Sequence, residues 1–400
     1  MKIIVVGGSN SMREEGYVYD LEKLFHGVEI LNRSLGASTS SMALFNLIDR
    51  NEIEPGDLVI WEYALNDTNH IVRMGYDQRM IMRMVEHTIR ICSSRGAAFL
   101  PVILTPREIE REVAPIPYRT ALHFLFNAYG IPFIDLSLEV RARFQVPHIP
   151  LEDYEDENHL LRNGRVFAYL TELIAEKVRL GVKAPEPACP VYLKVDQTVH
   201  VLRNLSGGVG KELVNRRYST AYRAPDGSPV LAEPESIAGR VIGVVVISGA
   251  DAGILTITSG GNSVNVSIRH DHKGFRKPAV KMLTLPNLME GDCHVGPGQP
   301  LVFTWAESNL PFVADMDFVS DFDSGETNPM EGGIVALLIE SGTFSESDAR
   351  TKRGNRSNRH SGKSLFDRKA FANTTKRERT RLRKFLRKIR GRKGKKRAKV

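Results

Sequence analysis

The sequence predicts a doubly wound α/β domain built on a parallel sheet, followed by an all-β domain and a basic, partly helical tail. Three observations support this fold class. Up to residue 182, short runs of apolar and β-branched residues alternate with segments of helical period, as in repeated βα units. Beyond a Pro-rich stretch at 183–190, only short runs of strand type remain. The last 50 residues contain 22 Lys and Arg and only two acidic residues.

The α/β region, residues 1–182, shows the elements of a parallel sheet in chain order. Its strand candidates are the runs KIIVV, VEIL, DLVIWE, AFLPVIL and IPFIDL, whose nearly continuous apolar character is typical of buried parallel strands. Apolar residues three and four positions apart predict helices over 14–25, 40–50, 76–94, 118–128 and 160–180. Catalytic residues of such sheets gather at the carboxyl ends of the strands, so the candidate site is expected there.

The region 191–345 is predicted to be a second domain, joined to the first by the linker 183–190. Its runs VIGVVVIS, GILTITS, SVNVSIRH, PLVFTWAE and GIVALLIE are separated by Gly, Pro, Asn and Asp. Short strand-like runs separated by turn residues are typical of an antiparallel β-sandwich or jelly roll, and the sequence does not distinguish between the two. The domain is expected to bind a glycan or to serve structure and oligomerisation.

The tail, residues 346–400, differs in charge from the rest of the chain. The first 350 residues carry 45 Asp and Glu against 33 Lys and Arg, so the tail alone makes the protein basic. A Gly/Ser/Asn/Arg segment is expected to be disordered, and an amphipathic helix is expected near 375–390. Residues 375–400 are therefore predicted to bind an anionic membrane surface or a nucleic acid, the alternative being a merely solvated tail.

Only three cysteines occur, without CxxC spacing, and no run of 18 apolar residues is present. We therefore expect a cytoplasmic protein, peripheral at the inner membrane surface if the tail binds lipid. No cofactor and no metal site is expected. A metal site at His270-Asp271-His272 is the alternative to the simpler interpretation of these residues as solvated histidines.

Polar residues follow the predicted strands in an ordered series. Gly7-Gly8-Ser9 ends the first strand, Gly36 follows the second, and Asn66 and Asp67 follow the third. Asp156-Glu157-Asn158-His159 precedes the last predicted helix of the α/β region. A serine hydroxyl needs a neighbouring base to become nucleophilic, and a histidine oriented by a carboxylate supplies one. Ser9, His159 and Asp156 are thus the candidate nucleophile, base and orienting acid.

In order and spacing these motifs resemble the four blocks of the SGNH, or GDSL-type, hydrolase family over residues 1–180. The resemblance implies an oxyanion hole made by the Ser9 amide, the Gly36 amide and the Asn66 side chain. Two positions depart from the family pattern, since Gly8 replaces its usual Asp and Ala64 its usual Gly.

The resemblance implies a serine esterase or O-acyltransferase that acts on acyl esters, acetyl above all, of a carbohydrate or polysaccharide. Another small ester is the alternative substrate. The rival interpretation is a non-catalytic glycan- or partner-binding protein on the same fold, with a polyanion-binding tail. Substrate contacts are expected from Asn10, Asp67 and Arg107, and Ser11 is the alternative nucleophile.

Overall fold

A computed structural model describes residues 1–111, 116–215, 218–249, 252–269, 278–289, 293–306, 313–314 and 332–343. All of them belong to one compact unit, formed by Met1–Val319 and Glu326–Thr351. The tail segment 351–400, with its expected helix, and the triplet His270-Asp271-His272 lie outside the described residues.

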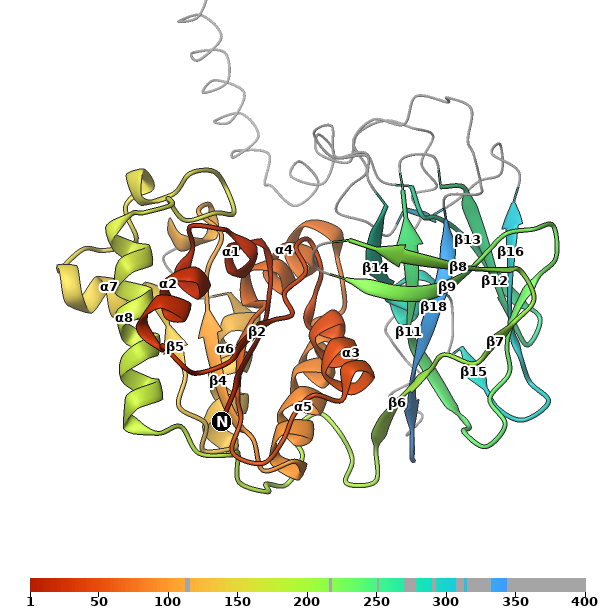
Figure 1. Cartoon of the computed structure of the whole chain (residues 1–400), viewed down its shortest axis with the longest axis horizontal. Helices are drawn as coiled ribbons and strands as arrows, with labels where there is room; N and C mark the ends of the chain where they lie inside the picture. The colour runs from red at the N-terminus through yellow and green to blue at the C-terminus, as the bar shows by residue number, and fades with distance from the viewer. Residues whose placement is uncertain are drawn as a thin grey trace, which may run out of the picture. The chain divides into compact units, whose positions relative to one another are not determined.

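A five-stranded parallel sheet forms the N-terminal part (Figure 1), with the order β2-β1-β3-β4-β5. The strands are β1 (Ile3–Gly7), β2 (Ile30–Asn32), β3 (Leu58–Glu62), β4 (Ala98–Ile103) and β5 (Ile134–Asp135). The order runs outward in both directions from the first strand, which is doubly wound topology. This sheet with flanking helices confirms the predicted α/β class.

Helices cover both faces of this sheet because alternate strand residues point to opposite sides. Ile3 and Val5 of β1 lie in one apolar core, whereas Ile4 and Val6 lie in another. The first core is shared with α2 (Tyr17–Leu24), α7 (Leu136–Phe144) and α8 (Arg165–Leu180), and the second with α3 (Ser40–Arg50), α4 (Ala64–Met74), α5 (Gln78–Ser94) and α6 (Pro117–Ala128). The short helix α1 (Ser9–Met12) and the 3₁₀ turns Ile109–Arg111 and Leu151–Asp153 complete this part.

The remaining strands form two mainly antiparallel sheets, which confirms a β-rich second part. One sheet has the order β17-β13-β12-β16-β10-β7, and the other has β14-β11-β18-β9-β8 with β15 beside β11 and β6 beside β18. The strands are β6 (Thr198–Leu202), β7 (Leu205–Ser206), β8 (Val209–Val214), β9 (Ser219–Ala224), β10 (Val230–Ala232), β11 (Gly239–Ser248), β12 (Ile254–Ser259), β13 (Asn262–Ser267), β14 (Ala279–Leu283), β15 (His294–Val295), β16 (Leu301–Ala306), β17 (Val313–Ala314) and β18 (Gly333–Ser341). The helix α9 (Leu285–Leu288) follows β14.

The central strands β11 and β18 are buried on both faces. On one face Val244 and Leu337 pack in the core between the two β-sheets. On the other face Val245 packs with Phe45 of α3, and Leu338 packs with Met84 of α5. Two-sided burial explains why the runs VIGVVVIS and GIVALLIE are nearly continuous in apolar residues instead of alternating.

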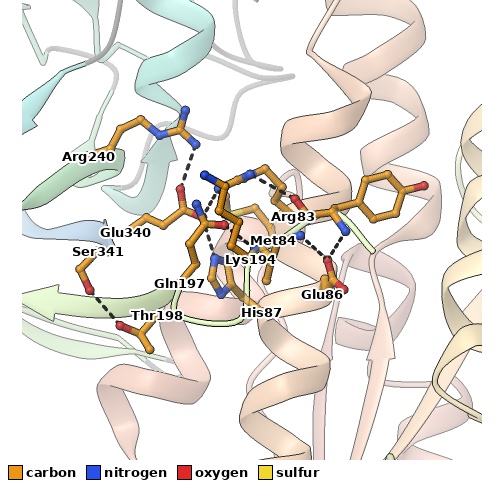
Figure 2. A network of polar contacts seen from close by, with 12 residues as sticks. Arg83, Met84, Glu86, His87, Lys194, Gln197, Thr198, Arg240, Glu340 and Ser341 are labelled. Atoms are coloured by element: carbon orange, nitrogen blue, oxygen red, sulfur yellow. Dashed lines mark hydrogen bonds and ion pairs between the residues drawn. The ribbon is translucent and has the colours of Figure 1, made fainter. Parts of the chain in front are cut away.

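A network of charged side chains links α5 to the β-rich part (Figure 2). Glu340 of β18 is fully buried, and its Oε1 accepts hydrogen bonds from Arg83 Nη2 at 2.7 Å and from His87 Nε2 at 2.8 Å. Its Oε2 accepts a hydrogen bond from Arg240 Nη2 at 2.9 Å. The Glu340 carboxylate is therefore paired with two buried guanidinium groups.

The helix α5 also holds the segment that enters the β-rich part. The Glu86 carboxylate accepts hydrogen bonds from three successive backbone amides, those of residues 191, 192 and 193. One turn further, Arg90 donates to the carbonyl groups of Lys194 and Val195. The predicted linker 183–190 has no regular secondary structure. The domain boundaries at 182 and 191 stay a prediction.

Within the described residues, no helix is both long enough and apolar enough to cross a membrane.

Candidate active site

The ends of β1 and β3 place the first group of predicted site residues side by side. Gly7 and Glu62 are paired in register at the carboxyl ends of these neighbouring strands. Ser9 begins α1 directly after β1, and Asn66 lies in the first turn of α4, directly after β3. Parallel pairing therefore brings two motifs together that are 57 residues apart in the sequence.

Ser9, His159 and Asp156 form a continuous hydrogen-bonded chain. Ser9 Oγ lies 2.7 Å from His159 Nε2, and His159 Nδ1 lies 2.8 Å from Asp156 Oδ2. Burial alone would raise the pKa of Asp156, but hydrogen bonds from the Asn158 amide and the His159 ring outweigh it, so the pKa lies below its ordinary value. The ionised carboxylate favours a proton on Nδ1, which leaves Nε2 free to accept the Ser9 proton.

Gly36 lies beside Ser9, the candidate nucleophile. A Cβ atom on Gly36 would lie 3.4 Å from the Ser9 Cβ atom. The Gly36 amide donates to Met12 Sδ at 2.8 Å. Because a thioether is a weak acceptor, a negatively charged oxygen would compete well for this amide.

Asn66 packs directly against the nucleophile turn. A Cβ atom on Gly8 would lie 2.2 Å from Asn66 Oδ1 and 2.9 Å from its Cγ. The glycine at position 8 therefore leaves the space that the Asn66 carboxamide occupies.

Adding a methyl group at position 8 is expected to displace Asn66 without straining the backbone, since Gly8 has a φ of −83°. Gly8→Ala should lower kcat by about 10² to 10³, the usual cost of losing one oxyanion-hole donor, with a smaller change in KM. Hydrolysis of p-nitrophenyl acetate measures both constants. Gly210→Ala is the matched control, because its Cβ would meet only Arg223 Nη1, at 3.7 Å. A Gly8→Ala variant as active as this control would contradict the assignment of Asn66.

Asp67 does not face a substrate, which corrects its expected role. Its side chain is fully buried, with Oδ1 accepting the Ser40 amide and Oδ2 accepting the Ser40 and Tyr118 hydroxyl groups. Burial raises the pKa of Asp67 to about 6. Asp67 thus joins α4 to the first turn of α3.

Ser11, the alternative nucleophile, is also fully buried. Its Oγ donates to Glu62 Oε2 at 2.7 Å and lies 2.7 Å from the Tyr17 hydroxyl oxygen, whereas Ser9 takes the place beside His159. Glu62 Oε2 also accepts the Gly8 amide at 3.3 Å, so this carboxyl group bonds to the turn that precedes Ser9. Burial raises the pKa of Glu62 to about 8. Sequence reasoning missed Glu62, although an acidic residue that ends an apolar strand was a visible signal.

Asn10 and Arg107 both contact the loop that carries His159, but through different atoms. The buried Asn10 side chain bonds to the backbone of Asn158 and Leu160. Arg107 donates its backbone amide to the Glu157 carbonyl at 2.9 Å, and its side chain is partly exposed. The Asn10 carboxamide is therefore occupied within the protein, which corrects its expected contact with substrate. The role of the Arg107 side chain stays a prediction.

Within the described residues, no group of three or more His, Cys, Asp or Glu side chains is placed so that it could hold a metal ion.

No family model and no curated protein matches the sequence. Solved structures that resemble the chain include a protein from Bacillus subtilis (18% identity, TM-score 0.38), of which the matched region covers only 56%. A lipolytic protein of the G-D-S-L family from Veillonella parvula is 17% identical, with 44% of this chain and 99% of that chain covered and a TM-score of 0.36. The acetyl xylan esterase AlAXEase is 15% identical, with the same coverage and a TM-score of 0.37.

Proposed function

We propose that the α/β part is a serine hydrolase of the SGNH type, a carboxylic ester hydrolase or O-acyltransferase. The observation that carries the proposal is the hydrogen-bonded chain from Ser9 Oγ through both ring nitrogens of His159 to Asp156. Serine, histidine and carboxylate in this arrangement can activate a hydroxyl group at neutral pH.

In the proposed mechanism, Ser9 Oγ attacks the ester carbonyl carbon while His159 Nε2 takes the hydroxyl proton. The carbonyl oxygen becomes an oxyanion, stabilised by the Gly36 amide, the Asn66 side chain and the Ser9 amide. The tetrahedral intermediate then expels the alcohol, which receives the proton from His159. Water hydrolyses the resulting acyl-enzyme, or an acceptor alcohol takes the acyl group, with His159 as the base again.

The proposed substrate is an acyl ester, with acetyl as the acyl group and a carbohydrate or polysaccharide as the alcohol. This choice rests on the resemblance of the sequence motifs to the SGNH family. A non-catalytic glycan- or partner-binding protein on the same fold is the second candidate.

Labelling with a serine-directed phosphonate ester separates the two candidates. The full-length protein is expected to gain one covalent adduct, mapped by mass spectrometry to Ser9, because His159 activates this hydroxyl and no other serine is assigned to it. Ser9→Ala and His159→Ala should both abolish the adduct, whereas Ser248→Ala should leave it unchanged, because Ser248 is a fully buried serine of β11 whose hydroxyl donates to the Ile268 carbonyl. An unlabelled wild-type protein that binds glycans would support the second candidate.

A further inference from the structure

The loop that carries the catalytic base is held on both sides of His159 by one side chain. Asn10 Nδ2 donates to the carbonyl oxygen of Asn158 at 3.0 Å. Asn10 Oδ1 accepts the amide of Leu160 at 3.3 Å. The two groups of this carboxamide therefore bracket His159 by its flanking peptide units, and the side chain is only 1% exposed.

Asn10 is also the residue next to the nucleophile, on a short helix that is itself anchored. The Ser11 hydroxyl is bonded to Glu62, and the Ser11 carbonyl accepts Asn32 Nδ2 at 2.7 Å. Because Ser9 and Asn10 are consecutive, the geometry that fixes Ser9 also fixes the carboxamide that holds the His159 loop.

The geometry points to Asn10 as a positioning residue that sets the distance between the Ser9 hydroxyl and the His159 ring. This inference rests on the proposed function, and it assigns a role that the motif resemblance does not supply. The Ser9–His159 hydrogen bond alone joins two side chains that can rotate. Asn10 joins the two backbones, so the 2.7 Å contact is preorganised before a substrate binds.

Other described contacts from elsewhere in the chain do not bond to the two peptide units that flank His159, although Arg13 bonds on both sides of the ring, to the Glu155 carboxylate and to the Leu160 carbonyl. Asn69 Nδ2 donates to the Asn158 side chain at 3.0 Å, and Arg107 donates its backbone amide to Glu157. Arg13 donates to the Leu160 carbonyl at 2.9 Å. These bonds hold the loop in place as a whole, whereas Asn10 fixes the peptide units on either side of the catalytic ring.

Replacing Asn10 by alanine in the full-length protein tests this role by kinetics. The kcat for p-nitrophenyl acetate should fall about 10- to 100-fold, with KM changed less than about twofold, because the reacting groups and not the binding surface are displaced. In a His159→Ala background the same replacement should cost no further activity. Asn46→Ala is the matched control, since Asn46 is also buried and bonds to the Arg33 carbonyl, not to the His159 loop. It should lower the melting temperature but not kcat.

A second measurement does not depend on turnover. The His159 Nδ1 proton, bonded to Asp156, should give a downfield proton resonance that disappears in His159→Ala, is lost or broadened in Asn10→Ala, and persists in Asn46→Ala. If Asn10→Ala retains both the resonance and the wild-type kcat, the positioning role is wrong. If the resonance responds to Asn10 but Ser9→Ala is as active as wild type, the positioning role stands and the proposed function fails.

Discussion

Ser9→Ala and His159→Ala are each expected to lower kcat for ester hydrolysis by a factor on the order of 10⁴ to 10⁶. The 2.7 Å contact between Ser9 Oγ and His159 Nε2 makes nucleophile and base one functional unit, so removing either removes the activated hydroxyl. The double variant should therefore cost little more than either single one. Steady-state hydrolysis of p-nitrophenyl acetate, corrected for the uncatalysed rate, measures all three losses.

Ser11→Ala provides the internal comparison for this prediction. Its hydroxyl bonds to Glu62 and Tyr17 and not to His159, so its replacement should affect the melting temperature more than the chemical step. Full activity of Ser9→Ala, or additive losses in the double variant, would show that the three side chains do not act as a triad.

Glu340→Gln is expected to lower the free energy of unfolding by about 3 to 5 kcal/mol, the usual cost of breaking a buried ion pair from one side. The neutral amide has nearly the same shape, but it leaves the guanidinium groups of Arg83 and Arg240 buried without their counter-charge. Urea denaturation at pH 7 measures the loss. Asp20→Asn, which removes an exposed pair with Lys23, is the control and should change stability by less than about 1 kcal/mol. A similar change in both variants would mean that the buried network contributes no more than a surface pair.

The Glu340 network also predicts how the stability of the fold depends on pH. Burial opposes ionisation of Glu340, but His87 and the two arginines outweigh it and lower the pKa to about 2. A carboxylate with a depressed pKa stabilises the fold above its unfolded pKa, here about 4.5, and the contribution is lost as the pH falls toward about 2. The stability difference between wild type and Glu340→Gln should therefore narrow across this window. Burial lowers the pKa of His87, which adds to the loss of stability below about 6.5.

The fold class was predictable because its signals are local. Each strand of the parallel sheet shows as a short apolar run, and the residue after a strand is identified once the strand is identified. The helix 40–50 was predicted to the residue, because its apolar period is regular. The helices 64–74 and 136–144 were missed, the first because it begins inside the ALND motif, the second because its apolar residues do not form one face.

The candidate site was predictable to the extent that its residues belong to motifs. Ser9, Gly36, Asn66 and His159 lie near one another, because the sheet order places their loops at one edge, and their catalytic roles stay a prediction. The burial of Asp67 and Asn10 was not predictable, since their partners lie 27 and about 150 residues away. Hydrogen bonds between residues so far apart depend on how the helices pack, so local sequence patterns do not predict them.

The hydrogen bonds between α5 and distant parts of the chain have a consequence for biosynthesis. Arg83 and Glu340 are separated by 257 residues, so on the order of 10 to 50 seconds of translation pass between them. The amides that Glu86 receives also emerge more than 100 residues after it. The buried charged side chains of α5 can therefore reach their folded-state partners only after β18 has left the ribosome.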